Sequence, residues 1–210
     1  MIKAVIFDLD GVIVSTDDLH YKAWKHMADL EKIDFDKKIN HRLRGVSRME
    51  SLNIILEKAT KKYSDQEKEE LARIKNDYYV DLLNELTPND ILPNVNEVLI
   101  ALREKSIKIA IGSSSKNAKN ILNHIELSDM FDVIADGHDI NHSKPAPDVF
   151  LIAAKRLGVD PKDCIVVEDA VAGIEAAKRA DMIAVAVSDA KKSDLADYKF
   201  DHINALLSLI

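Results

Sequence analysis

Five short apolar runs rich in β-branched residues recur along this chain of 210 residues. They are KAVIFDLD (3–10), IKIAIGS (107–113), FDVIADG (131–137), CIVVEDA (164–170) and MIAVAVS (182–188). Strands that are almost continuously apolar are buried on both faces, which is typical of a parallel sheet covered by helices on each side. The sequence therefore predicts an α/β fold.

The segments between the later runs carry helical patterns. In one of them, four apolar residues follow the spacing i, i+3, i+4 and i+7, which is one face of a helix: Val95, Val98, Leu99 and Leu102. The segment PDVFLIAAKRLG (147–158) begins with a proline and ends with Gly158, which are typical of a helix start and a helix stop. Strands thus alternate with amphipathic helices.

Residues from about 15 to 88 interrupt this rhythm, because they carry no strand pattern. The segments predicted as helical are DDLHYKAWKHMADLEK (17–32), SRMESLNIILEKA (47–59) and SDQEKEELARIKNDYYVDLLNEL (64–86). The turn-rich TPNDILPN (87–94) then ends the last helix and returns the chain to the sheet. This pattern predicts a helical insertion between the first strand and the rest of the core.

Two pairs of acidic residues stand where apolar runs end. Asp8 and Asp10 close the first run and, since side chains alternate along a strand, they project to the same side. Glu168 and Asp169 close the fourth run in the same way. Open α/β sheets bind ligands at the carboxyl ends of their strands, so the pairs crowd one crevice if their strands are neighbours. Such a cluster favours Mg²⁺, because a divalent cation relieves the repulsion and prefers oxygen ligands; alternatively, each pair merely caps a loop.

Two further segments suit a phosphate. The second run ends in hydroxyl-bearing and basic residues at an expected helix start, where backbone N–H groups bind anions: Ser113, Ser114, Ser115, Lys116 and Asn117. Serines are also common helix caps, so this signal alone is weak. Lys144 precedes two prolines that stiffen its loop and hold the ammonium in a defined place, although an isolated lysine is usually solvated.

Four segments in this order resemble the four motifs of the haloacid dehalogenase-like hydrolase superfamily: DLDGVIV (8–14), IGSSSKN (111–117), SKPAPD (143–148) and VVEDAVAGI (166–174). The helical insertion lies where that family carries a cap. The resemblance implies a Rossmann-like parallel-sheet core of residues 1–15 and 88–210, with a small helical cap domain of residues 16–87 inserted after the first strand.

The resemblance also implies roles for the motif residues. Asp8 is then the nucleophile that becomes an aspartyl phosphate, a role that suits a carboxylate already ionised at neutral pH. Asp10 is the general acid and base, which requires a raised pKa. Lys144 and Ser113 balance charge on the transferring phosphoryl group. Mg²⁺ is held by Asp8, the backbone carbonyl of Asp10, and Asp169, with Glu168 supporting the metal site.

A segment of the insertion, RGVSR (44–48), resembles the substrate-specificity segment of the β-phosphoglucomutase subfamily. Arginine binds a phosphate in a bidentate manner. Ser47 fits the N-cap of the helix that follows. Gly45 and Val46 offer backbone groups to sugar hydroxyls. A solvated helix start is the alternative interpretation of this segment.

Further positions match the same subfamily. The resemblance implies that Thr16, at the start of the hinge, and His20 couple the cap to the general acid, with His20 contacting Asp10 when the cap closes. Lys75 and Asn76 match cap residues that face the site in that subfamily. With the cap shut, Arg48 joins Ser115, Lys116 and Asn117 around the second phosphate. The implied substrate-binding residues are Arg44, Gly45, Val46, Ser47, Arg48, Ser51, Lys75, Asn76, Ser113, Ser114, Ser115, Lys116 and Asn117.

The subfamily implies interconversion of β-glucose 1-phosphate and glucose 6-phosphate, with hexose phosphates as the small-molecule partners. Transfer from Asp8 to either end of one sugar passes through β-glucose 1,6-bisphosphate, so it needs anion sites on both the core and the cap. One alternative is a sugar-phosphate phosphatase of the same superfamily, which needs only the first of these sites. A non-catalytic regulator that binds sugar phosphates is the other, disfavoured by the intact Asp8, Asp10, Lys144 and Asp169.

Composition narrows the class of protein. Apolar residues make up 47%, which suits a filled core, and the net charge of −7 argues against a nucleic-acid binder. The single cysteine, Cys164, forms no internal disulfide and is expected to be a small core residue. Without a leader pattern or an apolar run of the ~18 residues that span a bilayer, we expect a cytoplasmic protein with no membrane partner. This cap type is typical of monomers.

Overall fold

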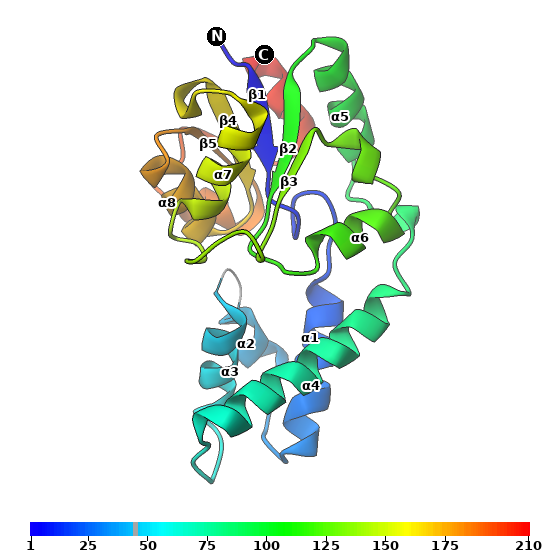
Figure 1. The fold of residues 1–210 in the computed structure, drawn as a ribbon, viewed down its shortest axis with the longest axis vertical. Coiled ribbons are helices and arrows are strands. Elements are labelled where there is room, and N and C mark those ends of the chain that lie inside the picture. The colour runs from blue at the N-terminus through cyan, green and yellow to red at the C-terminus, as the bar shows by residue number, and fades with distance from the viewer. Residues whose placement is uncertain (44–45) are drawn as a thin grey trace. The chain divides into compact units, whose positions relative to one another are not determined.

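The computed structural model describes residues 1–43 and 46–210, which divide into two compact units (Figure 1). One, called here the α/β unit, comprises Met1–Ser15 and Leu86–Ile210. The other, called the helical unit, comprises Thr16–Glu85. The helical unit is thus an insertion in the sequence of the α/β unit.

The α/β unit contains a six-stranded, fully parallel sheet of order β3-β2-β1-β4-β5-β6. Its strands are β1 (Ala4–Phe7), β2 (Lys108–Gly112), β3 (Val133–Ala135), β4 (Cys164–Glu168), β5 (Ile183–Ala186) and β6 (Tyr198–Lys199). Its α-helices are α5 (Val95–Glu104), α6 (Ala118–His124), α7 (Asp148–Leu157) and α8 (Val171–Arg179). Short 3₁₀ helices are η1 (Pro88–Asp90), η2 (Ser128–Met130), η3 (Pro161–Asp163), η4 (Ser188–Lys192) and η5 (Ile203–Leu209). The predicted α/β fold class is confirmed.

Helices cover both faces of the sheet (Figure 1). Ala4 and Ile6 of β1 face a cluster that includes α7 and α8, while the alternating Val5 and Phe7 point to the opposite face, where α5 and η5 lie. All four predicted core positions of α5 are buried. The α7 helix ends as predicted at Gly158, whose backbone is left-handed, with φ of +67°. Cys164 is buried in β4, as expected.

The order of the strands places a topological switch point between β1 and β4, because the chain continues from β1 to β2 on one side and β4 lies on the other. The parallel register sets Phe7 beside Val167, and the Asp8 N–H donates to the Val167 carbonyl at 3.0 Å. Asp8 and Glu168 are the next residues of the two segments, so they lie side by side at this junction. Ligands of open α/β sheets bind at such a point.

The helical unit consists of α1 (Asp17–Leu30), α2 (Lys37–His41), α3 (Arg48–Leu56) and α4 (Asp65–Leu83). The α4 helix packs against both α1 and α3. Its core includes Trp24, Met27, Leu52 and Leu71, all at most 5% exposed. The unit therefore has a hydrophobic core of its own.

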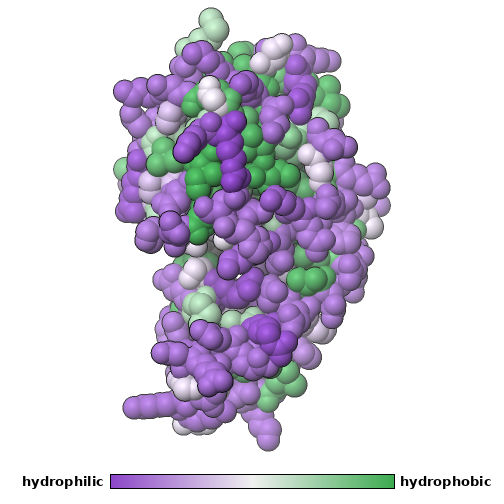
Figure 2. Space-filling view, viewed as in Figure 1, coloured by the Kyte–Doolittle hydropathy of each residue, from purple (hydrophilic) through white to green (hydrophobic). Residues whose placement is uncertain are grey.

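The surface seen in Figure 2 is mostly hydrophilic, with apolar side chains gathered in one broad patch over the α/β unit and in smaller patches elsewhere. Large exposed apolar residues such as Leu30, Ile100 and Leu151 lie on different helices. Within the described residues, no helix has the length and apolar character needed to cross a membrane.

Candidate active site

Three carboxyl groups converge at the switch point of the sheet. One oxygen each of Asp8, Glu168 and Asp169 lies within 4.8 Å of the other two. Asp8 follows β1 directly, Glu168 is the last residue of β4, and Asp169 comes next. The predicted convergence of the two acidic pairs is thus observed for three of the four residues, because β1 and β4 are neighbouring parallel strands.

The Asp10 side chain is not part of this three-carboxylate cluster. The β1 strand ends at Phe7, so the first acidic pair does not extend the strand as its alternation suggested. Asp10 instead lies in a turn where it forms a bridge with Val14, and it is half-buried. This position sets the Asp10 carboxyl apart from the three clustered carboxyl groups.

Lys144 supplies the cation of the cluster. Its ammonium donates hydrogen bonds of 2.5 Å to both Asp8 Oδ1 and Glu168 Oε1, and it lies 4.7 Å from the ring centroid of Phe150. Burial opposes a charge on Lys144, but the two carboxylates outweigh burial and raise the Lys144 pKa above its ordinary range. The lysine is therefore a buried, charged residue at 9% exposure, not the solvated one that an isolated lysine suggests.

Asp169 lies beside this ion pair but is less well compensated. Burial, followed by the nearby carboxyl groups of Glu168 and Asp8, raises the Asp169 pKa to about 8. Burial also raises the pKa of Glu168, against the attraction of Lys144. An added cation would stabilise the ionised form of Asp169. The three oxygen donors therefore fit a Mg²⁺ ion by their chemistry and spacing.

Two glycines leave room for these carboxyl groups. Gly11 has a φ of +81°, and a Cβ there would lie 2.2 Å from Asp169 Oδ2. A Cβ on Gly173, in the first turn of α8, would lie 1.9 Å from the carboxyl carbon of Glu168. Sequence reasoning did not assign a role to Gly173, although an isolated glycine within a helical segment is a signal of close packing.

The predicted phosphate loop forms tight turns before α6. The Ser113 hydroxyl accepts from the Ser115 N–H, and the Ser115 hydroxyl accepts from the Asn117 N–H, both at 3.1 Å. Within the described residues, the buried Ser114 hydroxyl oxygen has no hydrogen-bond partner. A buried polar group of this kind fits a polar ligand. Lys116 is exposed at the same loop.

In the helical unit, two predicted substrate-binding residues are in contact. Arg48, the first residue of α3, donates from Nη2 to Asn76 Oδ1 of α4 at 2.7 Å. Burial lowers the Arg48 pKa below its ordinary value, a cost that a bound anion would offset. The Ser47 hydroxyl accepts from the Glu50 N–H at 3.3 Å, which confirms Ser47 as the N-cap of α3.

The remaining predicted residues of this segment are distributed as follows. Val46 is half-buried in the bend before Ser47, and Ser51 is buried in α3. Arg44 and Gly45 lie outside the described residues.

His20 and Lys75 are also brought together in the helical unit. Lys75 Nζ lies 2.9 Å from His20 Nδ1, and the Lys75 residue is only 3% exposed. Burial, together with the charges of Lys75 and Arg48, lowers the His20 pKa well below its ordinary value, so its imidazole is neutral at neutral pH. Thr16 is buried at the start of α1, and its carbonyl accepts from the His20 N–H at 2.9 Å.

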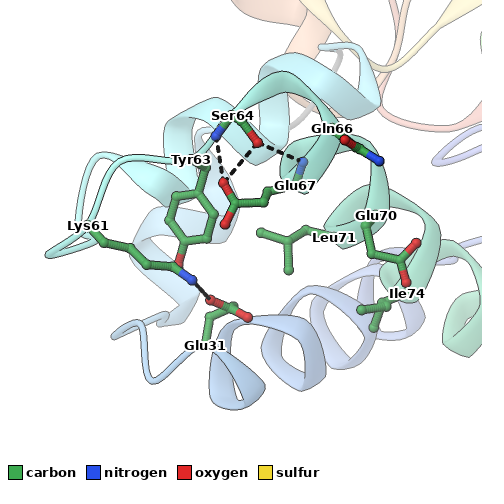
Figure 3. A pocket seen from close by; sticks show the side chains of 9 residues that line it. All are labelled: Glu31, Lys61, Tyr63, Ser64, Gln66, Glu67, Glu70, Leu71 and Ile74. Carbon is green, nitrogen blue, oxygen red and sulfur yellow. Dashed lines mark hydrogen bonds and ion pairs between the residues drawn. The ribbon is translucent and has the colours of Figure 1, made fainter.

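A separate pocket of about 370 Å³ opens within the helical unit, and Figure 3 shows how its polar groups pair with one another. Tyr63 donates to Glu31 at 2.8 Å, and Lys61 lies 3.2 Å from the same carboxylate. Ser64 and Glu67 form the capping box at the start of α4. None of the predicted site residues that the structure describes lines this pocket. The polar groups that line this pocket thus pair with one another and stabilise the local fold.

Comparisons with known proteins agree with this geometry. The family model of the haloacid dehalogenase-like hydrolases matches residues 2–181. The chain is 49% identical over 187 residues to the β-phosphoglucomutase of Bacillus subtilis, covering 88% of this chain and 83% of that protein. It is 33% identical over 181 residues to a phosphorylated carbohydrates phosphatase of Thermotoga maritima, covering 85% and 81%. The crystal structure of β-phosphoglucomutase from Clostridium difficile is similar, with a TM-score of 0.90, 47% identity, and coverage of 98% and 93%.

We predict that Lys144→Met destabilises the metal-free protein by about 3–5 kcal/mol, because it leaves the buried Asp8 and Glu168 carboxylates without their cation. Urea unfolding measures this loss. Lys3→Met is the matched control, since it removes an exposed ion pair with Asp163 and is expected to have little effect. Equal stability of the two variants would contradict the importance of the buried pair.

The Asp169 pKa predicts a pH dependence that Mg²⁺ removes. In the folded, metal-free protein Asp169 keeps its proton up to about pH 8, whereas the ordinary value is 3.8. Between these pH values the folded state therefore binds more protons than the unfolded state. The stability that protonated Asp169 contributes to the folded state is complete below the ordinary pKa and is lost as the pH rises through about 8. We expect the melting temperatures in EDTA and in Mg²⁺ to diverge as the pH rises.

Asp169→Asn is the control for this prediction, because the amide does not ionise, and it should abolish the divergence. Parallel melting curves in EDTA and in Mg²⁺ across the same pH range would show that Asp169 does not titrate as described.

Proposed function

Because this chain belongs to the haloacid dehalogenase-like hydrolases, we infer that it is a Mg²⁺-dependent β-phosphoglucomutase that interconverts β-D-glucose 1-phosphate and D-glucose 6-phosphate. The observation that carries this inference is the 49% identity to the Bacillus subtilis enzyme, since a match of 187 residues must include parts of both units. The proposal includes a monomer, as the type of cap implies, and a location in the cytoplasm.

In the proposed reaction Asp8 is the phosphoryl carrier. An oxygen of its carboxylate forms a bond to phosphorus as the bond from phosphorus to the sugar oxygen breaks, and the aspartyl phosphate then gives the phosphoryl group to a sugar hydroxyl. Lys144 supports this role because its ammonium already holds Asp8 at 2.5 Å, where it neutralises charge close to the reacting atoms. Ser113 and Ser114, at the end of β2, are proposed to bind the same phosphoryl group.

Asp10 is proposed to move the proton. It gives a proton to the sugar oxygen that leaves phosphorus and takes one from the hydroxyl that attacks, so the proton count balances over both steps. Its place outside the carboxylate cluster supports this division of roles. Thr16 and His20 are proposed to orient Asp10 when substrate is bound.

Asp8, Asp169 and the backbone carbonyl of Asp10 are proposed to hold Mg²⁺, and Glu168 is proposed to support them. The clustered carboxylate oxygens and the raised Asp169 pKa support this assignment. When bound, Mg²⁺ supplies positive charge that offsets repulsion between the Asp8 carboxylate and the phosphate.

A mutase must also bind the phosphate that is not being transferred. We propose that Arg48 and Asn76 of the helical unit do this together with Ser115, Lys116 and Asn117. The 2.7 Å contact between Arg48 and Asn76 supports a pre-oriented guanidinium, which suits bidentate binding of a phosphate. With both phosphates held, β-glucose 1,6-bisphosphate is the proposed intermediate.

The remaining cap residues are proposed to complete the sugar site. The hexose would be contacted by Arg44, Gly45, Val46, Ser47 and Ser51. Lys75 would lie close to these residues. Substrate binding would bring the two units together, exclude water and protect the aspartyl phosphate.

A sugar-phosphate phosphatase is the second candidate function, favoured by the 33% identity to the Thermotoga maritima phosphatase. The test is to supply purified protein, Mg²⁺ and catalytic glucose 1,6-bisphosphate with either anomer of glucose 1-phosphate. Glucose 6-phosphate and free phosphate are measured in parallel. We expect glucose 6-phosphate from the β anomer only, with little free phosphate, and no turnover by Asp8→Asn.

Either of two results would overturn this inference. Release of phosphate in excess of glucose 6-phosphate would favour the phosphatase, and equal use of the α anomer would contradict recognition of the β sugar.

The proposed second phosphate site predicts a selective effect of Arg48→Met. It should raise the KM for the bisphosphate roughly ten- to a hundredfold, since a charged hydrogen bond to phosphate is worth about 1.5–3 kcal/mol. Arg42→Met is the matched control, because Arg42 forms a bidentate pair with the exposed Glu57 and should leave the KM unchanged. Equal KM values for both variants would exclude this role of Arg48.

A further inference from the structure

Two aromatic rings of the helical unit enclose the Lys75 ammonium. Its Nζ lies 4.3 Å from the ring centroid of Tyr79 and 5.0 Å from that of Trp24. The rings come from α4 and α1, respectively, so both helices contribute to the enclosure. Distances below about 6 Å from the ring centroid favour a cation over an aromatic face. The box formed by Trp24 and Tyr79 therefore suits a charged lysine.

The same Tyr79 ring also supports His20. The two rings stack with centroids 4.2 Å apart and an interplanar angle of 24°. His20 Nδ1 is at the same time 2.9 Å from Lys75 Nζ. Tyr79 thus orders both members of the His20–Lys75 pair, and Trp24, one turn further along α1 than His20, confines the ammonium from the other helix.

This arrangement determines the position of the imidazole proton. An ammonium group has three donors and no acceptor, so Nδ1 must accept the hydrogen bond. A neutral imidazole that accepts at Nδ1 carries its only proton on Nε2. A proton on both nitrogens is disfavoured because burial and the charges of Lys75 and Arg48 oppose an imidazolium.

We propose that Trp24 and Tyr79 are positioning residues that hold Lys75 against His20 and thereby fix His20 as a neutral imidazole with its proton on Nε2. His20 then presents a constant N–H donor and does not exchange protons during the reaction. The catalytic consequence rests on the proposed function, in which His20 orients the general acid, whereas the tautomer itself does not depend on it.

The helical unit contains a matched control. His26 and Tyr78 form a second histidine–tyrosine stack between α1 and α4, with centroids 4.1 Å apart and an interplanar angle of 12°. Tyr78→Leu removes a stack between the same two helices but leaves the Lys75 box in place. Tyr79→Leu removes the ring that contacts both His20 and Lys75, and Tyr79→Phe keeps it.

The experiment is long-range ¹H–¹⁵N NMR of the full chain labelled with ¹⁵N-histidine, at neutral pH, with the His20 signals assigned from His20→Gln. We expect a protonated Nε2 and an unprotonated Nδ1 at His20 in the unaltered protein, in Tyr79→Phe and in Tyr78→Leu. Lys75→Met and Tyr79→Leu should give mixed tautomers. Trp24→Leu is a second test of the box, and the other histidine signals report whether each variant is folded.

Kinetics provide the second measurement. Tyr79→Leu should lower kcat roughly tenfold, less than the roughly 10²–10⁴-fold that general acid–base catalysis contributes in full, because the general acid itself remains, and Tyr78→Leu should not lower it. A proton on Nδ1, or an imidazolium, in the unaltered protein would overturn the proposal. So would an unchanged His20 tautomer in folded Lys75→Met and Tyr79→Leu. Absence of isomerase activity with the expected tautomer would instead refute the proposed function alone.

Discussion

The buried ammonium of Lys144 between Asp8 and Glu168 is the interaction on which the site depends. Two carboxylates at the ends of neighbouring strands repel one another, and burial strengthens that repulsion. Lys144 donates hydrogen bonds of 2.5 Å to both, so it supplies a compensating positive charge where water is scarce. The parallel register of β1 and β4 and the missing Cβ of Gly173 make this arrangement possible. The sheet thus brings repelling carboxylates together at its switch point, and the positive charge of Lys144 compensates most of that repulsion.

Each unit contains a buried lysine that lies over an aromatic ring, but the two lysines have different effects. In the α/β unit Lys144 lies over the Phe150 ring and neutralises carboxylates, while in the helical unit Lys75 lies over Tyr79 and faces an imidazole. A buried lysine beside carboxylates holds negative charge in place. A buried lysine beside histidine prevents the ring from gaining a charge. Such a division suits a reaction in which one carboxylate carries the phosphoryl group and protons move through a different residue.

Much of the fold was predictable from the sequence, because continuous apolar runs identify buried strands and the spacing of Val95 to Leu102 identifies α5. The sequence did not reveal β6, whose two residues are exposed and carry no apolar run, nor α2, whose start depends on a local bond from the Ile39 N–H to Asp36 at 2.8 Å. The motifs identified the acidic cluster, but the pairing of Lys144 with Glu168 requires residues far apart in sequence to meet. The contacts of Trp24 and Tyr79 with Lys75 were not predicted either, because they join α1 and α4, which are far apart in sequence. Taken alone, Trp24 is typical of core packing.

The central claim is that the carboxylate of Asp8 carries the phosphoryl group. The direct measurement is to quench the protein during turnover with β-glucose 1,6-bisphosphate and Mg²⁺, reduce it with borohydride, and map the peptides by mass spectrometry. Borohydride converts an aspartyl phosphate to homoserine. The account predicts homoserine at position 8 and unaltered aspartate at positions 10 and 169. Homoserine at another position, or none at position 8 while turnover continues, would contradict it.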